Sequence, residues 1–445
     1  MTSDAVPDRS AAPVDAGLLS PVTAGLDGPV TDAAVVSALV RAEIALVRAY
    51  ARLGVAPGEA ADAADALADI EIDAARLAAD AVAGGNPVIP LVGLLRAQSP
   101  APVRPWVHRG ATSQDIVDTA LMCVARDAVQ TALIALARAS AALRLLARTE
   151  RTTVAAARTL TQHAVPTTVG ARAATWARGI DRAASRLEAA RQALPAQLAG
   201  AGGTLAAFVE IAGAEGAASL PALFAADLGL AAPDGSWHTR RWPVTELGDA
   251  LVQAVDAAGK FATDVATLSR TEIGEVSQAS GGGSSAMPQK QNPVEAVLIR
   301  SAALRAPQLG ATLHLASALA VDERPDGAWH AEWPTLRELL RLALGASAHA
   351  ASLAEGLHVD RDAVARNLAS TRGLIMAERL SLVLAPVIGA ERVAALVAEA
   401  TRGADLADLL RALPEAPSID IVTLLDPAAY IGTAAASADG EGSPP

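Results

Sequence analysis

The chain of 445 residues is poor in cysteine and in aromatic side chains, and each shortage excludes a class of protein. Its one cysteine, Cys123, cannot form an intrachain disulfide, so we expect a reducing, cytoplasmic location. Aromatic residues make up 2% of the chain, alanine, leucine and arginine dominate, and runs of β-branched residues are few. This balance favours helices that pack through small side chains, and we predict no strand.

The chain is also short of positive charge, because its formal net charge is −12. Such a surface repels nucleic acid and anionic membranes, and we predict neither as a partner. No positively charged, apolar leader is visible at the N-terminus. The weakly charged stretch at 306–321 is interrupted by Gln308, Gly310 and His314, so we expect no membrane span.

Sequence motifs for metals and nucleotides are missing as well. The sequence has no His-x-x-x-His pattern, and one cysteine cannot build a thiolate site, so we predict no metal. No glycine-rich dinucleotide fingerprint follows a predicted strand. We therefore expect an enzyme or binding protein that works without a cofactor.

Apolar residues recur at helical spacing along most of the chain, as in the stripe Leu247, Leu251 and Val255. Thr31 and Asp32 are expected to cap the first helix, and Gly54 to end it. Several runs of about 25 to 35 residues exceed the mean helix length of about 11 to 12, which favours a long bundle. The expected runs cover about 33–53, 57–83, 113–148, 167–197, 245–277, 294–320 and 334–355, with shorter helices after 359.

This pattern predicts an all-α chain with disordered tails at both ends. The tails are rich in Ala, Ser, Asp, Gly and Pro. Long alanine-rich helices leave apolar flanks, so we also expect an oligomer. The predicted parts are a tail at 1–15, an N-terminal helical domain at 16–110, a central long-helix bundle at 111–356, a C-terminal helical domain at 357–432 and a tail at 433–445.

Three separated segments carry polar groups among small residues: 108–115, 158–168 and 281–293. The third, Gly-Gly-Gly-Ser-Ser-Ala-Met-Pro-Gln-Lys-Gln-Asn-Pro, is the most informative. Its glycines allow close approach of the backbone to a ligand, and Pro293 is suited to the start of a helix. The segment therefore predicts a loop that brings a hydroxyl, a cation and an amide to a helix N-terminus.

These segments resemble the three signature regions of the fumarase/aspartase superfamily. The loop match is long and specific, and the matches at 110–115 and 166–170 are shorter. The resemblance covers roughly 20–430 and implies a three-domain, all-α subunit with a five-helix bundle. It also implies a homotetramer with a twenty-helix core, whose active sites take one segment from each of three subunits. Within the superfamily, the segments 158–166, 291–294 and 322–333 look most like bacterial 3-carboxy-cis,cis-muconate cycloisomerases.

The chain departs from the lyase pattern at two positions. Many family lyases carry a histidine where this chain has Leu160, and a glutamate where it has Val297. On a helix, Glu295 lies about 200° from the face of Val297 and is a poor substitute. That His–Glu pair protonates poor leaving groups such as hydroxide or amines. A carboxylate, whose acid has a pKa of about 4, leaves or attacks as an anion and needs no such help. The absence of the His–Glu pair therefore favours intramolecular lactonisation.

The resemblance implies roles for individual residues. Ser284 is the expected proton-transfer group, and its alkoxide would be stabilised by loop amides, a helix N-terminus and Lys290. The other residues are expected to bind the carboxylates of a small tricarboxylate substrate. They are His108, Thr112, Ser113, Thr161, Gln162, His163, Ser285, Asn292 and Arg324.

Plainer interpretations stay open for several of these residues. Ser284 fits a flexible linker, Thr112 and Ser113 fit a helix cap, and Arg324 fits an ion pair with the acidic residues before it. Three functions also stay open. The first is a 3-carboxy-cis,cis-muconate cycloisomerase, the second is a fumarate-releasing lyase of the adenylosuccinate or argininosuccinate type, and the third is a non-catalytic protein that reuses the fold.

Overall fold

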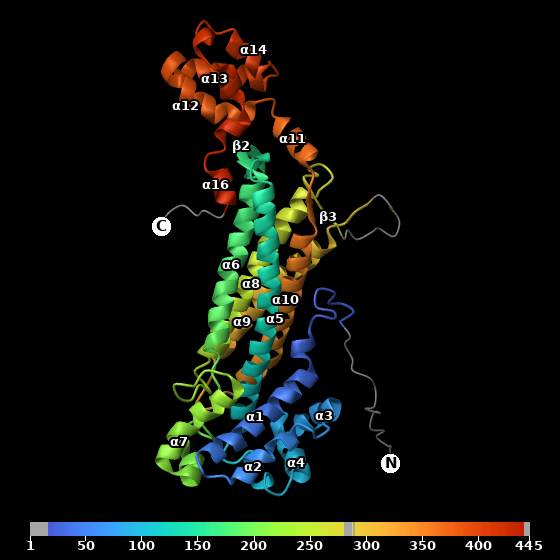
Figure 1. Ribbon diagram of the computed structural model, residues 1–445, viewed down its shortest axis with the longest axis vertical. Coiled ribbons are helices and arrows are strands. Elements are labelled where there is room, and N and C mark those ends of the chain that lie inside the picture. Colours follow the sequence, from blue (N-terminus) through green and yellow to red (C-terminus); the bar gives the residue numbers. More distant parts are fainter. Residues whose placement is uncertain (1–16, 280–286, 288–289, 440–445) are drawn as a thin grey trace. The chain divides into compact units, whose positions relative to one another are not determined.

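The computed structural model describes residues 17–279, 287 and 290–439 of the chain. Ser284 and Ser285, predicted to act on the substrate, lie outside the described residues. The described part is mainly helical, as predicted (Figure 1). Its five longest helices are α5 (Ser113–Thr149), α6 (Val169–Ala193), α8 (Trp242–Leu268), α9 (Val294–Ala318) and α10 (Gly327–Glu355).

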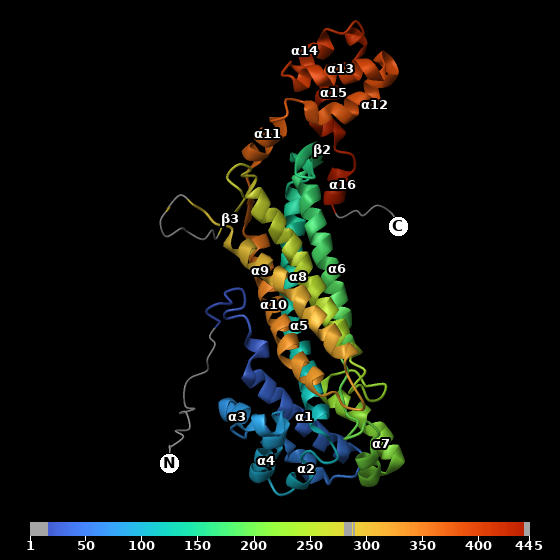
Figure 2. The same cartoon turned by 180° about the vertical axis from the view of Figure 1, so that it is seen from behind.

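Close contacts divide the chain into two units, and the boundary falls inside each of the five long helices. Unit 1 contains the described residues up to 134, 183–256 and 301–348, and unit 2 contains the described residues of 135–182, 257–300 and 349–445. Within each unit, segments of these helices lie side by side (Figure 2). The three consecutive domains expected from the sequence, 16–110, 111–356 and 357–432, divide the chain differently from these two units and stay a prediction.

Unit 1 adds shorter helices to these segments. Helix α1 (Asp32–Arg52) begins as predicted, because the Thr31 side chain accepts a hydrogen bond from the Ala34 amide, and Gly54 follows its end with φ +71°. The run expected at 57–83 is broken, because Asp73 caps a new helix there. Its parts are α2 (Gly58–Asp62), a 3-10 turn (Ala64–Leu67) and α3 (Ala74–Gly84), and α4 (Val88–Gln98) and α7 (Ala206–Leu228) complete the unit.

The prediction that the chain has no strand is wrong. Unit 2 contains a hairpin of β1 (Val154–Thr159) and β2 (Gln162–Thr168), and a second antiparallel pair of β3 (Val276–Gln278) and β4 (Leu357–Val359). The hairpin lies in the second signature segment, whose short polar run gave no helical or strand periodicity. Thr159 pairs with Gln162, so Leu160 and Thr161 form the two-residue turn.

The C-terminal residues of unit 2 form short helices around an apolar cluster that includes Leu380, Leu384, Leu406 and Leu410. The helices of this cluster are α12 (Ala377–Ile388), α13 (Ala390–Thr401), α14 (Leu406–Arg411) and α15 (Ile421–Leu425). Two other short helices contact the hairpin instead: α11 (Arg361–Ala369) contacts β1, and α16 (Ala434–Ala438) contacts β2.

Among the described residues, two helices, α5 and α7, have the length and apolar composition of a membrane span, although no such span was predicted. More than half of the apolar window in α5, 56%, is buried inside the protein, which fits the core helix of a soluble bundle. The window in α7 is 22% buried, and the helix is interrupted by non-helical Gly213.

Candidate functional site

Unit 1 holds the first signature segment, where α5 begins. Thr112 occupies the capping position, because its backbone amide donates to the Asp115 carboxylate at 3.0 Å, as in a capping box. Asp115 is fully buried and also accepts hydrogen bonds from the amides of Ala199 and Gly200 and from His238 Nε2, at 2.9, 3.0 and 2.9 Å. One carboxylate therefore fixes the start of α5 against two other segments.

Two predicted binding residues meet at this point. The guanidinium of Arg324 donates to the Thr112 hydroxyl and, at 3.1 Å, to the carbonyl of Ala201. Arg324 remains exposed, and Ser113 is half-buried beside Thr112. The ion pair of Arg324 with the acidic residues before it, considered from the sequence, is not among the contacts of the described residues. The cap and the cation together can receive an anionic group.

His108 also lies in unit 1 and is paired with a residue that sequence reasoning missed. Its ring Nδ1 lies 2.7 Å from Glu43 Oε1, and its backbone amide donates to Glu43 Oε2 at 2.7 Å. Glu43 lies on α1 and is fully buried. No local pattern links two residues that are 65 positions apart.

Unit 2 holds the second signature segment, at the tip of the β1–β2 hairpin. Leu160 and Thr161 have φ of +48° and +75°, as a tight type I′ hairpin turn requires. Leu160, at the position of the family histidine, is 96% exposed. The predicted binding residues Thr161 and Gln162 are exposed beside it and hydrogen-bonded to each other at 3.2 Å.

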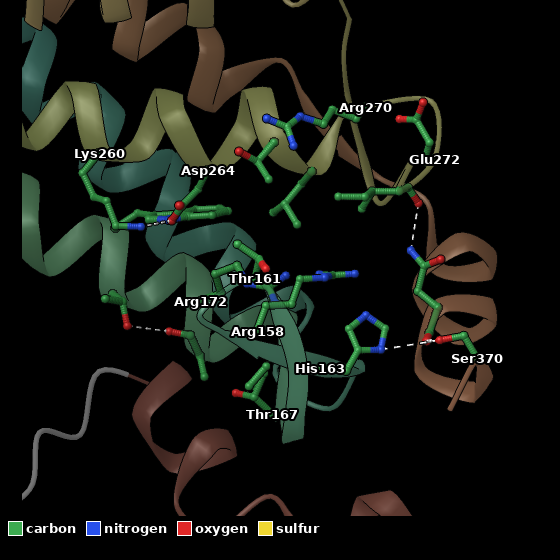
Figure 3. A pocket seen from close by; sticks show the side chains of 18 residues that line it. Arg158, Thr161, His163, Thr167, Arg172, Lys260, Asp264, Arg270, Glu272 and Ser370 are labelled. Atoms are coloured by element: carbon green, nitrogen blue, oxygen red, sulfur yellow. Dashed lines mark hydrogen bonds and ion pairs between the residues drawn. The ribbon is translucent and has the colours of Figure 1, made fainter. Parts of the chain in front are cut away.

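A cavity of about 860 Å³ opens next to this hairpin within unit 2, and Thr161 and His163 both line it. Figure 3 shows the side chains around the cavity, with His163 facing Ser370, the residue that follows α11. The other charged lining residues, which sequence reasoning did not single out as ligands, carry four positive and two negative charges. They are Arg158, Arg172, Lys260, Arg270, Asp264 and Glu272.

A buried carboxylate organises two of these cations. Glu275, 1% exposed, accepts hydrogen bonds from both terminal nitrogens of Arg158, from Arg172 at 3.4 Å and from Asn367 at 2.9 Å. Burial alone would raise the pKa of Glu275, but the hydrogen bonds and charges of these partners hold it below its usual value. The hairpin, α6 and α11 are thus tied to the segment that enters β3.

Electrostatics also set the state of His163. Burial and, after it, the positive charge of Arg158 lower the pKa of His163, and Glu275 only partly offsets this. Since the ordinary value is already 6.5, the ring is neutral at pH 7. His163 can therefore donate or accept a hydrogen bond, but it does not add a full positive charge to the cavity.

The described end of the third signature segment also lies in unit 2. Lys290 is exposed, and its backbone amide donates to the Met287 carbonyl at 3.0 Å. Asn292 is half-buried just before α9, which begins at Val294, one residue after the expected Pro293. These residues do not line the hairpin cavity.

The second departure from the lyase pattern, Val297, lies on α9 close to Glu295. Val297 is 51% exposed. Glu295 accepts a hydrogen bond from Gln278 of β3 at 2.9 Å. This contact supports the inference that Glu295 does not replace the missing glutamate.

The predicted residues therefore fall into two groups. Unit 1 brings Thr112 together with Arg324, and unit 2 brings Thr161 together with His163. No group of three or more His, Cys, Asp or Glu residues that could hold a metal ion occurs among the residues described here.

Known proteins resemble this chain along most of its length. It is 46% identical to a nitrosuccinate lyase of Streptomyces davaonensis over 446 aligned positions, which cover 95% of this chain and 94% of the relative. It is 39% identical to a 3-carboxy-cis,cis-muconate cycloisomerase of Pseudomonas aeruginosa, with 88% of each chain covered. The solved structure of the 3-carboxy-cis,cis-muconate lactonizing enzyme of Pseudomonas putida matches with a TM-score of 0.86 and 33% identity, covering 95% of this chain and 97% of the other.

The model of the lyase family matches residues 30–307, which is more than half of the chain and includes all three signature segments. The resemblance inferred from the segments at 108–115, 158–168 and 281–293 is thereby confirmed. The chain belongs to the lyase family of the fumarase/aspartase superfamily.

Proposed function

We propose that this chain catalyses elimination, or the reverse addition, next to a carboxylate, with a leaving group that departs as a stable anion. One observation carries the proposal: the two positions of the family's general-acid pair hold Leu160 and Val297, which have no proton to give. Leaving groups that need protonation would gain nothing from this site. Nitrite and carboxylate are both conjugate bases of fairly strong acids and leave without help.

Nitrosuccinate is the first candidate substrate, supported by 46% identity to a nitrosuccinate lyase over nearly the whole chain. The Ser284 alkoxide removes a proton from the carbon next to one carboxylate. The electron pair passes through an aci-carboxylate to form the carbon–carbon double bond. The carbon–nitrogen bond breaks, nitrite leaves with its electron pair, and fumarate remains. Ser284 then returns its proton to water.

Lactonisation of 3-carboxy-cis,cis-muconate, the function preferred from the sequence, is the second candidate. It is supported by the cycloisomerase relatives and by the TM-score of 0.86 to a lactonizing enzyme. There a substrate carboxylate adds to the double bond as an ionised nucleophile, and Ser284 delivers a proton to the developing carbanion. The product is 4-carboxymuconolactone, an intermediate of protocatechuate breakdown in the β-ketoadipate pathway.

Both candidates are polyanions, and the chain gathers cations for them despite its negative charge. Arg324 supplies one beside Thr112, and Arg158, Arg172 and Arg270 line the hairpin cavity. Lys290 supplies another at the predicted loop. Preorganised cations and amides aimed at growing charge are usually the largest catalytic term. A homotetramer that combines segments of three subunits, as the family resemblance implies, would assemble these groups into one site in the cytoplasm.

A substrate panel tests the proposal. Purified protein is incubated with nitrosuccinate, with nitrite and fumarate measured separately, and with 3-carboxy-cis,cis-muconate, with the loss of its ultraviolet absorbance followed. Adenylosuccinate and argininosuccinate test the alternative with protonated leaving groups. Equal release of nitrite and fumarate supports the first candidate, and turnover of the muconate supports the second.

The Ser284→Ala variant should slow the active reaction by about 10²- to 10⁴-fold, the usual size of a proton-transfer contribution. Ser277→Ala, which changes an exposed serine of β3, is the matched control and should leave the rate unchanged. Faster turnover of adenylosuccinate than of nitrosuccinate or 3-carboxy-cis,cis-muconate would contradict the proposal. A lack of turnover with every substrate would favour the non-catalytic alternative.

A further inference from the structure

The backbone around His108 adopts a conformation that has to be held in place. His108 has a φ of +54°, in the left-handed region that non-glycine residues seldom adopt. Such a conformation persists where the surroundings hold it in place. Residues of this kind are concentrated at active sites, so the anchors of this segment carry functional information.

Three side chains anchor three successive residues here. Arg96 donates to the Val107 carbonyl at 3.0 Å, Glu43 accepts from the His108 amide at 2.7 Å, and the Tyr50 hydroxyl donates to the Arg109 carbonyl at 2.8 Å. Glu43 and Tyr50 both lie on α1. Glu43 differs from the other two because it also holds the side chain of the residue it anchors.

The ring contact determines which imidazole nitrogen is available. Glu43 Oε1 lies 2.7 Å from His108 Nδ1, and an ionised carboxylate can only accept hydrogen bonds. With the carboxylate as acceptor, Nδ1 is the donor in this contact and carries a proton, so Nε2 is the ring nitrogen left to contact other groups. The His108 side chain is 16% exposed while that of Glu43 is 0% exposed, so the pair presents the histidine to its surroundings and hides the carboxylate.

We propose that Glu43 is a positioning residue for catalysis, which fixes the Nδ1–H tautomer of His108 and directs Nε2 to the substrate. This inference rests on the proposed function in taking His108 as a substrate-binding residue. It adds Glu43, a residue of α1 that lies outside all three signature segments and 65 positions before His108 in the chain.

The Glu43→Gln variant tests the role of the carboxylate. A glutamine that still accepts from the His108 backbone amide must turn its NH₂ group toward Nδ1, and this favours a proton on Nε2 instead. We expect kcat/KM for the active substrate of the panel to fall at least about tenfold, since a wrong histidine tautomer is a severe catalytic defect. Tyr50→Phe is the matched control, because it removes the neighbouring anchor without touching the histidine ring.

A double-mutant cycle separates positioning from general loosening. If Glu43 acts through His108, adding Glu43→Gln to His108→Ala should cause no further loss of kcat/KM. Full additivity of the two losses would overturn the proposal, and so would an equal loss in Tyr50→Phe. Wild-type kcat/KM in folded Glu43→Gln would overturn it as well.

The tautomer can be measured without activity and without a Glu43 variant. Nitrogen NMR of the wild-type protein labelled with ¹⁵N-histidine, assigned by comparison with His108→Ala, should show the proton of neutral His108 on Nδ1. A proton on Nε2 would overturn the proposal even if Glu43→Gln failed to fold. Conversely, if no substrate of the panel reacted but the Nδ1–H tautomer were found, the proposed function would fail while the positioning contact stood.

Discussion

Replacing Glu275 by glutamine should loosen the hairpin that carries Thr161 and His163. The carboxylate is 1% exposed and holds Arg158 and Arg172, whose side chains are 16% and 18% exposed. Glutamine keeps the size of the side chain but leaves both guanidinium groups facing a neutral amide. Breaking a buried ion pair by changing one partner costs about 3 to 5 kcal/mol.

Hydrogen exchange of the β1–β2 amides is the suitable measurement, because it reports local opening of the hairpin without requiring the whole chain to unfold in a single step. At about 1.4 kcal/mol for each factor of ten, the expected loss raises exchange by roughly 10²- to 4 × 10³-fold. The ladder amides between Val154–Thr159 and Gln162–Thr168 should show this change. Amides in α1 of unit 1 serve as the internal reference.

Glu272→Gln is the matched control, because Glu272 is an exposed acid only three positions away. It should leave exchange in the hairpin within about twofold of the wild-type rate, as surface substitutions usually do. An increase of less than about tenfold in Glu275→Gln would refute the reasoning. It would mean that Arg158 and Arg172 find solvent or other partners at little cost.

Three further predictions follow from described contacts. The side chain of Arg241 is 1% exposed and bridges the buried carboxylates of Asp118 and Glu332. Arg241→Met should therefore destabilise unit 1 by about 3 to 5 kcal/mol, measured by hydrogen exchange. No change in exchange would show that the two carboxylates are protonated or hydrated. The hydrogen-bond partners of Glu275 hold its pKa below the usual value of 4.5, so the stabilisation by its carboxylate is complete above pH 4.5 and is lost as the pH falls through the lowered pKa. Hydrogen exchange in the hairpin, corrected for its intrinsic pH dependence, should therefore accelerate in this acid range. The acceleration should be smaller in Glu275→Gln. Leu160→His should change the stability of the hairpin by less than about 0.5 kcal/mol in hydrogen exchange of the β1–β2 amides, because the side chain is 96% exposed. A larger loss would reveal a contact of Leu160 in the assembled protein.

Local sequence patterns predicted the long helices well, but they missed the β1–β2 hairpin and the break between α2 and α3. The cap at Thr31 and the long helices could be predicted because each depends on residues a few positions apart. The β1–β2 hairpin was missed, since its turn at Leu160 and Thr161 contains neither glycine nor asparagine, the usual signals of such a turn. The break near Asp73 was missed because a continuous alanine-rich run concealed a second cap.

The candidate site shows the same division. Thr112, His108 and His163 were identified from motifs, whereas Glu43 and Glu275 were not. Glu43 is 65 positions from His108, and Glu275 is 117 positions from Arg158, so only the folded chain brings each pair together. From Leu160 and Val297 the sequence favours a leaving group that is a stable anion. Nitrite and carboxylate meet that condition equally, so these two residues do not separate the two candidate substrates.

The turn at Leu160 has a consequence for how this enzyme could change its chemistry. Its φ of +48° lies in a region where histidine is enriched several-fold over most non-glycine residues, and leucine is not. The backbone conformation therefore does not favour leucine at this position. Packing does not favour it either, because the side chain is exposed. A histidine could therefore be regained at this tip without refolding the hairpin, but a full His–Glu pair would also need a glutamate in place of Val297.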